Sequence, residues 1–418
     1  MLEAPRQPMQ RGKGIAAVLV AFALVLTGTV SLHGGKKTKE KPAPVVKPNF
    51  LDLLDYSKIV WPNPPAITRI KYLDYFSAEG FQPKTQQKQK VAWMDRLSGV
   101  VTGETKADKP RFQLVTPYGV AVDSKGRLYV ADSKVLAVFI FDTQTKDVEL
   151  IKNGVHARFG WITGLVIDDA DRLYVADSKM RRVLVFDPQH KVEGSISEGM
   201  VSPGGMAIDT ENRFLYVADA ELDQVLVYDA DPPYKLLRRI GTGGKEHTLT
   251  TPGDFARPTN VAVDKEGNLY VSDTLNDRVE IFDAEGTFIR TFGKAGDGPG
   301  YFARPKGIAI DGDGHVWVAD AVQNRVQVFT QEGRLLIWMG EHGLLPGQFR
   351  SLAGLTIDKN NRVFTSEQFP GRVQMFQYVS DAQAKAEKER REGEMQEKKT
   401  GAPAKEAVAS KAQPSAAK

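Results

Sequence analysis

The sequence predicts an all-β protein in which one unit of four short antiparallel strands is written six times. A motif close to Gly-x-Ala-x-Asp opens each unit, and a run close to Leu-Tyr-Val-Ala-Asp follows it in every copy. A third run close to Arg-Val-x-Val-Phe-Asp comes next, and turn residues such as Lys125-Gly126 separate the runs. The opening aspartates of the six units are Asp123, Asp168, Asp209, Asp264, Asp311 and Asp358.

Each unit has the length and strand content of one propeller blade. The opening aspartates are 41 to 55 residues apart. A fourth β-rich run completes most copies, at 148–151, 235–240, 287–292 and 335–338. Four antiparallel strands repeated at this period are typical of a β-propeller. The sequence therefore predicts a six-bladed β-propeller over residues 117–379, made of four-stranded antiparallel blades.

The sixth copy lacks a fourth strand of its own. After residue 379 the chain becomes charged and helical in pattern, so the outer edge of this blade has no following strand. An unpaired edge invites aggregation. Residues 67–76, within a leader over 51–116, have the composition of a strand. We expect this latch strand to pair with the outer edge of blade six and close the ring.

The two ends of the chain have other compositions. Residues 1–35 combine a basic start with an apolar run over 14–32, which is long enough to span a bilayer. They predict a transmembrane or signal helix that tethers the protein to the inner membrane, on its periplasmic side. Secretion after cleavage is the alternative. Residues 36–50 resemble a Lys- and Pro-rich tether, and residues 380–418 predict a charged helix followed by a disordered tail.

Motifs at the start of two copies resemble a known repeat. Gly253-Asp-Phe-Ala-Arg-Pro258 and Gly300-Tyr-Phe-Ala-Arg-Pro305, together with Asn324-Arg325-Val, are similar to NHL repeats, and the resemblance extends over residues 117–376. The segment beginning at Trp61 also resembles the leader of exported bacterial NHL-repeat proteins. The resemblance implies a six-bladed propeller and leaves the activity open, because most of those proteins have no assigned activity.

Residues that recur in every blade are expected to be structural. The aspartate that closes the first run, Asp123 in blade one, is placed to accept hydrogen bonds from turn amides. The aspartate that closes the second run, Asp132 in blade one, is placed to hold the following loop. Function is therefore expected at positions where the copies differ.

Enzymatic alternatives depend on the ring of residues that begins each first strand. Gluconolactonase-like lactonases, which are also six-bladed, place acids and Asn around the channel mouth, and calcium needs several carboxylate oxygens. This ring has no acid, and Asn260 is the polar residue beside it. The ring positions are Tyr118, Thr163, Gly204, Thr259, Lys306 and Ala353.

A zinc site is a weaker alternative. The amidating lyase, an NHL-related enzyme, holds a channel zinc with histidines, and three histidines with an open position make a catalytic zinc site. Here His156, His247 and His342 lie in loops that lead into blades two, four and six. The chain has no cysteine, which excludes thiolate ligands and cysteine nucleophiles. The sequence therefore predicts no catalytic residue, metal or other cofactor, and these histidines remain the alternative.

The preferred interpretation is a non-catalytic binding propeller. One face carries both the loops before the first strands and the loops between second and third strands, and aromatic and arginine residues on such loops suit protein binding. The partner is expected to be an exported or membrane protein. RNA binding is a third possibility, disfavoured by the export segment and a net charge of only +4. The sequence leaves the oligomeric state open. The candidate residues are Val135, Leu136, Trp161, Met180, Arg181, Leu222, Arg257, Arg304 and Phe369.

Overall fold

A computed structural model describes residues 54–77 and 112–400, with side chains up to residue 395. All of them belong to a compact unit over residues 49–418. The expected membrane segment over 1–35, the tether over 36–50 and the tail beyond residue 400 lie outside the described residues. Within the described part of the chain, no helix is both long and apolar enough to cross a membrane.

Six antiparallel sheets follow one another along the chain, and five of them have four strands in sequential order. Blade one consists of β3 (Pro117–Val122), β4 (Leu128–Asp132), β5 (Ala137–Phe141) and β6 (Val148–Lys152). Blade two consists of β7 (Ile162–Ile167), β8 (Leu173–Asp177), β9 (Arg182–Phe186) and β10 (Val192–Ile196). Blade three consists of β11 (Pro203–Asp209), β12 (Phe214–Asp219), β13 (Gln224–Asp229) and β14 (Leu236–Ile240).

The last three blades continue the pattern. Blade four consists of β15 (Pro258–Val263), β16 (Leu269–Asp273), β17 (Arg278–Phe282) and β18 (Phe288–Phe292). Blade five consists of β19 (Pro305–Ile310), β20 (Val316–Asp320), β21 (Arg325–Phe329) and β22 (Leu335–Met339). Blade six has β23 (Leu352–Ile357), β24 (Arg362–Glu367) and β25 (Arg372–Tyr378) as its inner strands. The prediction of a six-bladed β-propeller is confirmed.

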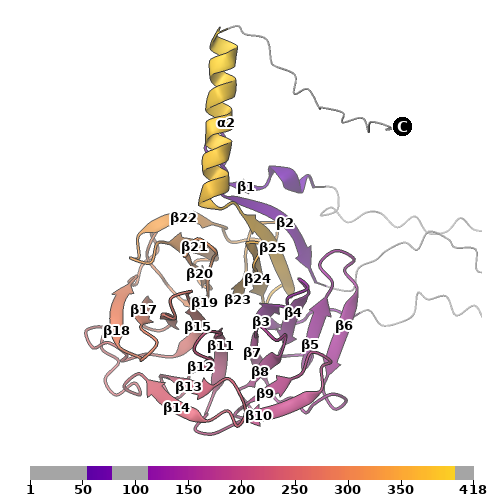
Figure 1. Ribbon diagram of the computed structural model, residues 1–418, viewed down its shortest axis with the longest axis vertical. Coiled ribbons are helices and arrows are strands. Elements are labelled where there is room, and N and C mark those ends of the chain that lie inside the picture. The colour runs from indigo at the N-terminus through magenta and orange to yellow at the C-terminus, as the bar shows by residue number, and fades with distance from the viewer. Residues whose placement is uncertain (1–53, 78–111, 401–418) are drawn as a thin grey trace, which may run out of the picture. The chain divides into compact units, whose positions relative to one another are not determined.

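The innermost strands stand side by side in a ring (Figure 1), and their residues line a central channel. Their backbones approach so closely that a side chain does not fit at the glycine of the opening motif. A Cβ atom on Gly164 would lie 2.0 Å from the carbonyl oxygen of Gly204, and one on Gly354 would lie 2.4 Å from that of Tyr118. The blades follow one another in chain order, with β23 next to β3. Blade one therefore lies opposite blade four, and blade two lies opposite blade five.

The hydrophobic core lies between neighbouring blades. Each middle strand is buried on both faces, as in β4 and β8, where all five residues are buried. One cluster, for example, joins Tyr129 and Ile140 of blade one to Leu173 of blade two. This two-sided burial explains why the second run of each copy is continuously apolar rather than alternating.

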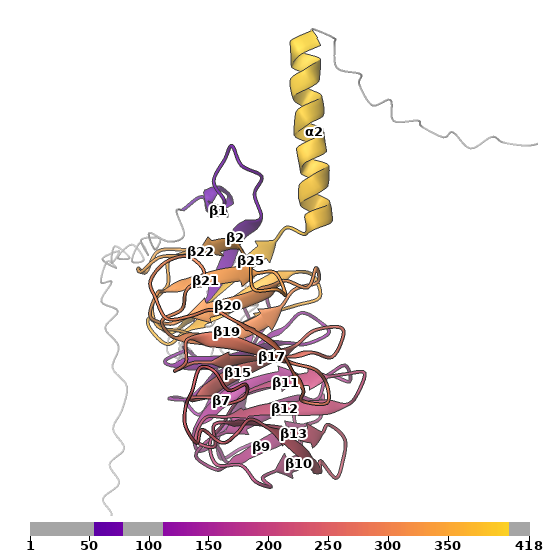
Figure 2. The same cartoon turned by 90° about the vertical axis from the view of Figure 1, so that its left-hand side faces the viewer.

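A strand from the N-terminal side completes blade six. β2 (Ile70–Phe76) pairs antiparallel with β25, with Tyr72 opposite Phe376, and the two strands lie side by side in both views (Figures 1 and 2). The rings of this pair meet edge to face at 5.3 Å. A short strand, β1 (Val60–Trp61), pairs with the outer edge of β2, so this sheet has five strands instead of the expected four. β1 thus shields the edge that β2 would otherwise expose.

The charged helix expected after the propeller is α2 (Asp381–Thr400), which follows β25 almost directly. Its first residue is tied to blade six, because Arg69 pairs with Asp381 and also donates a hydrogen bond of 2.7 Å to the Tyr378 hydroxyl. Farther along, Arg391 pairs with Glu387 at 2.7 Å, one turn earlier. These ion pairs support a helix whose side chains up to residue 395 are mostly exposed.

Candidate binding site at the channel mouth

The loops of the predicted binding face are held by one buried acid in each blade. In blade one Asp132 is fully buried and accepts hydrogen bonds from the amides of Val115 at 2.6 Å and Thr116 at 2.9 Å. It also accepts bonds from the amides of Lys134 and Val135. One carboxylate therefore fixes both the loop before the first strand and the loop after the second. The structural role expected for this residue is confirmed. The same position in the other blades is Asp177, Asp219, Asp273, Asp320 and Glu367.

A hollow of about 250 Å³ lies where these loops surround the channel. Its wall includes the six ring positions, and Trp161, Arg257 and Asn260 add to them. None of the residues that line it is an acid or a histidine. We call this hollow the channel mouth. The ring positions are Tyr118, Thr163, Gly204, Thr259, Lys306 and Ala353.

Three cations gather at one side of the mouth. Acids hold the backbone of two of them, since the amide of Arg257 donates to Asp223 at 2.6 Å and that of Arg304 donates to Asp320 at 3.1 Å. Both guanidinium groups are exposed, and Lys306 is half-buried between blades. Burial, and then the charges of the two arginines, lower the pKa of Lys306. Across the described part of the chain, none of these three side chains forms an ion pair or a hydrogen bond.

Asp277 is an acid near this cluster without being its counterion. Burial raises the pKa of Asp277, and the charge of Arg304 opposes that rise. One of its carboxylate oxygens is buried without a hydrogen-bond partner. No acid comes within the 4.0 Å ion-pair distance of Arg304 among the described residues. The cations of the mouth are therefore uncompensated by direct contact.

The opposite side of the mouth is aromatic. Tyr118 of blade one and Trp161 of blade two meet edge to face, with ring centroids 6.5 Å apart. Trp161 is 41% exposed, so it presents its indole to solvent and does not pack between blades. Because blades one and two lie across the ring from blades four and five, the aromatic pair faces Arg257 and Lys306 across the hollow.

A free amide lies on the channel side of the mouth. Asn260 stands where the other blades have the recurring glycine of the opening motif, and its side chain fills the space in which a Cβ on Gly205 would lie. It lines both the mouth and the channel below. No hydrogen bond of its side-chain amide occurs within the described residues. It can therefore donate to, or accept from, a bound polar group.

Arg304 and the remaining candidates lie on the loops but not in the wall of the mouth. Val135, Met180 and Phe369 are 38–49% exposed, and the guanidinium of Arg350 lies 4.4 Å above the Phe369 ring. Arg181 is also exposed. Two others contribute to the scaffold. Leu136 and Leu222 are half-buried and pack against the interblade clusters.

The three loop histidines do not converge. All are exposed, and His156 accepts a hydrogen bond of 3.0 Å from the amide of Lys152, within its own loop. His247 instead lies 4.0 Å from Asp223. No cluster of three or more His, Asp or Glu side chains that could hold a metal ion occurs in residues 54–77 and 112–395. The structure therefore does not bring His156, His247 and His342 together as the zinc alternative requires.

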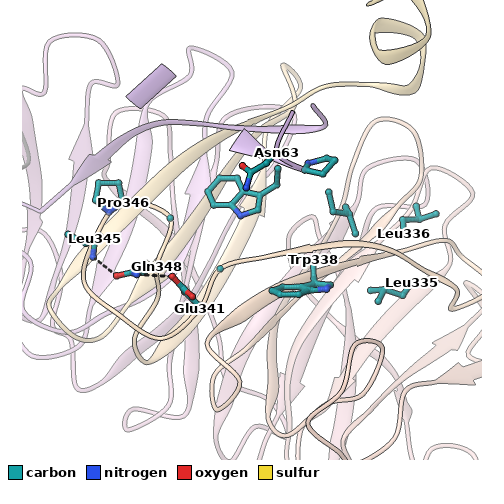
Figure 3. A pocket seen from close by; sticks show the side chains of 13 residues that line it. Asn63, Leu335, Leu336, Trp338, Glu341, Leu345, Pro346 and Gln348 are labelled. Atoms are coloured by element: carbon teal, nitrogen blue, oxygen red, sulfur yellow. Dashed lines mark hydrogen bonds between the residues drawn. The ribbon is translucent and has the colours of Figure 1, made fainter. Parts of the chain in front are cut away.

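A larger and more open hollow, about 750 Å³, lies beside the outer strand of blade five. Figure 3 shows Leu336 and Trp338 on one side of it, with Glu341 and Gln348 on the other. The amide of Gln348 donates to Glu341 at 2.9 Å, so these polar groups bond each other. This groove thus lacks the uncompensated charge that distinguishes the mouth.

Sequence reasoning missed Lys306, Tyr118 and Asn260 as members of the site. The available signal was that Lys306 is the only charged residue among the six ring positions. Whether Lys306 has a counterion depends on the positions of side chains from two blades, and the sequence alone does not give those positions.

Comparisons with known proteins agree with this architecture. Residues 249–316 match a family described as a 6-bladed beta-propeller, and residues 114–141 match the NHL repeat. No curated protein matches the sequence. The fold thus defines the class, a six-bladed β-propeller. The match to the NHL repeat is confined to residues 114–141, in the first blade.

Solved structures with a similar fold include three of different description. A gluconolactonase from Xanthomonas campestris is 20% identical, with 64% of this chain and 87% of that chain covered and a TM-score of 0.49. Virginiamycin B lyase from Staphylococcus aureus is 11% identical, covering 63% and 96%, with a TM-score of 0.47. Kuenenia stuttgartiensis hydrazine synthase is 14% identical, covering 67% and 100%, with a TM-score of 0.46.

Proposed function

We propose that this propeller is a non-catalytic binding domain that recognises a protein partner through its loop face. The observation that carries the proposal is the channel mouth, where Arg257, Arg304 and Lys306 lie together without counterions. A charged group that is partly removed from water, as Lys306 is, is normally paired in a folded protein. A cluster that keeps three unpaired cations at one side of the channel mouth is suited to an external anionic group.

The scaffold favours binding because it is already organised. Buried acids such as Asp320 fix the loops that carry the cations, so little ordering is needed when a partner arrives. Exposed aromatic and arginine side chains are the residue types that dominate binding energy at protein interfaces. Trp161 in the wall, with Met180 and Phe369 farther out, supplies such anchors on the same face.

The wall of the mouth is poorly suited to metal-dependent hydrolysis or lyase chemistry. Divalent cations such as calcium need several oxygen ligands with carboxylates among them. The lining contains neither acids nor histidines, and Lys306 with Arg257 would repel a divalent cation. This charge pattern favours a binding role over a lactonase-like or lyase-like role.

The proposed location is the periplasmic side of the inner membrane, with residues 14–32 as the tether. The support is the sequence pattern of a basic start and an apolar run. A reporter enzyme that is active only after export, fused after Lys418, is expected to be active. An inactive reporter, with the native protein found in the cytoplasm, would contradict this location.

Site-specific photo-cross-linking in native membranes tests the binding face. Blade two offers a matched pair, because Met180 lies on the loop face and Gln189 lies in an exposed turn on the opposite face. We expect a cross-linker at Met180 to capture a partner and one at Gln189 to miss it. The adduct should be lost in Trp161→Ala/Arg257→Ala, provided that its unfolding midpoint matches the parent. Capture of the same partner from Gln189, or an adduct that survives the double variant, would refute the proposal.

A further inference from the structure

We propose that the channel mouth receives an acidic–aromatic segment of the partner, with a carboxylate at Lys306 and an aromatic side chain against Trp161. This inference rests on the proposed function, since it names the chemistry that the same face recognises. It follows from the unequal distribution of residue types around the mouth.

The cationic side defines the charge of the ligand. Arg257 comes from the loop before blade four, and Arg304 and Lys306 come from the start of blade five. Arg257 and Lys306 line the mouth together, and the charges of both arginines act on the Lys306 ammonium. A carboxylate placed among them would form charge-assisted hydrogen bonds and would relieve the repulsion between the three cations. The free amide of Asn260 offers a further donor on the channel side.

The aromatic side of the mouth indicates which group of the ligand lies next to its carboxylate. Tyr118 and Trp161 meet edge to face and leave the indole 41% exposed across the mouth from the cations. Aromatic rings associate favourably in such edge-to-face or offset arrangements. A ligand with an acid next to an aromatic ring would therefore engage both sides of the mouth at once.

The size of the mouth favours a short segment. Its volume of about 250 Å³ lies below the range of about 300–1,000 Å³ that drug-sized ligands occupy. A pair of neighbouring side chains suits this space better than a large cofactor. The ring positions on the remaining side, such as Gly204 and Ala353, are small and leave room for the backbone of the segment.

Acidic residues on the loops next to the three cations favour a peptide over a nucleic acid as the ligand. Binding to nucleic acid requires basic residues that neutralise several phosphates in succession. Here Glu221, Asp223 and Asp277 lie on the loops of blades three and four, beside the cationic side. They interrupt any basic track that would lead away from Arg257.

The test uses two dipeptides that differ only in charge, acetyl-Phe-Asp-amide and acetyl-Phe-Asn-amide, added to the purified full chain. The chain carries 5-fluorotryptophan, and the fluorine signal of Trp161 is assigned through Trp161→Phe. Trp338, in the separate groove of blade five, serves as the internal control. We expect the Asp peptide to shift the Trp161 signal saturably, with at least about tenfold tighter binding than the Asn peptide.

Three variants decide whether the mouth is responsible. Lys306→Met should reduce the Asp peptide to the level of the Asn peptide, whereas Lys306→Arg should keep the preference. Lys134→Met removes one charge from the same face at an exposed loop and should leave the preference unchanged. Equal binding of the two peptides, or a preference that survives Lys306→Met, would overturn the proposal. So would displacement of the Asp peptide by octauridylate with a steep dependence on salt.

The outcomes separate this inference from the proposed function. If the Met180 adduct forms but is unaffected by Lys306→Met, and the two dipeptides bind alike, the protein-binding role stands and the acidic–aromatic ligand is wrong. If the Asp peptide binds through Lys306 while no partner is captured from the loop face, the ligand chemistry stands and the protein partner is wrong.

Discussion

The two ends of the propeller channel differ in whether their charged side chains have partners. The end opposite the channel mouth is a hollow of about 480 Å³ lined by the opening aspartates of several blades. Each of these carboxylates accepts hydrogen bonds from backbone amides of the turn that follows it. Asp264, for example, accepts hydrogen bonds from the amides of Glu266 and Asn268 at 3.1 and 2.8 Å and from the Tyr270 hydroxyl at 2.9 Å. At the channel mouth the recurring buried acids, such as Asp132, are likewise satisfied, but three cations have no ion-pair partner among the described residues: Arg257, Arg304 and Lys306.

The difference shows how to separate scaffold from site in a repeat protein. A charge that recurs in every blade, such as Asp264, is satisfied by elements that also recur. A charge that occurs once, such as Lys306, has no repeated partner and is available to an external group. Stability should therefore depend on the first kind of residue and binding on the second.

The largest expected effect on stability is at β2, the strand that completes blade six and closes the ring. Tyr72 of β2 is 2% exposed and packs edge to face with Tyr56 and Phe376. Tyr72→Ala should lower the free energy of unfolding by about 3–5 kcal/mol, the usual cost of deleting a large buried aromatic side chain. Urea denaturation followed by circular dichroism measures it.

The matched control is the loss of one oxygen atom. The Tyr72 hydroxyl is buried without a hydrogen-bond partner among the described residues. An unsatisfied buried donor costs free energy, so Tyr72→Phe should be neutral or stabilising by up to about 1 kcal/mol. A Tyr72→Ala variant as stable as Tyr72→Phe would show that β2 does not close the ring.

The second effect tests the repeated end of the channel. Asp264→Ala removes the acceptor of two turn amides and of the buried Tyr270 hydroxyl, which should cost about 2–3 kcal/mol of unfolding free energy. Glu266→Ala is the control, because this exposed side chain lies in the same turn and has no partner in the described region. Binding of the Asp dipeptide should be unchanged in both. An Asp264→Ala protein that is stable but fails to bind would reverse the assignment of the two ends.

Most of the fold was predictable because it is repeated, and the exceptions are informative. The fourth strand of blade two, β10, has the weak pattern Val-Glu-Gly-Ser-Ile and is partly exposed, so its neighbours fix it more than its own sequence does. β1 was missed because two residues carry no periodicity. The candidate site was only partly predictable. Trp161 is visible in the sequence as a departure from the repeat, whereas the missing counterion of Lys306 can be seen only when the side chains of neighbouring blades are placed in space.

The third effect is a pair of opposite pH dependences at the repeated end. A hydrogen bond with Asp311 raises the pKa of His315 in the folded protein, whereas burial, followed by the charge of Arg127, lowers that of His190. A raised folded pKa contributes stability that is present below about pH 6.5, the pKa of unfolded histidine, and is lost as pH rises through the folded pKa. A lowered folded pKa has the reverse sign, because the unfolded state then binds the proton more tightly.

Unfolding at pH 5.5 and 8.5 measures this difference. Relative to His315→Gln, the parent protein should gain stability on acidification by about 1 kcal/mol, the scale of one hydrogen bond. Relative to His190→Gln, it should lose stability on acidification. If both variants respond to pH with the same sign, the contacts of one histidine are not those described.

The smallest expected effect on stability is at Lys306, and it is the one that separates the two ends most clearly. Its ammonium is half-buried near Arg257 and Arg304 and has no counterion in the described residues, so the charged form is disfavoured in the folded state. Lys306→Met keeps the aliphatic length and removes the repulsion. It should raise the free energy of unfolding by about 0.5 kcal/mol while removing the preference for the Asp dipeptide, the trade between stability and function expected at a binding site. The gain should shrink between about 0.01 M and 1 M salt, because the salt itself screens the repulsion between the cations.

Lys265→Met is the control at the other end, where the ammonium donates to the Gly312 carbonyl at 2.8 Å. That variant should lose rather than gain stability, since a satisfied donor is removed. If Lys306→Met were as destabilising as Lys265→Met, Lys306 would be part of the scaffold, and the contrast between the two ends of the channel would fail.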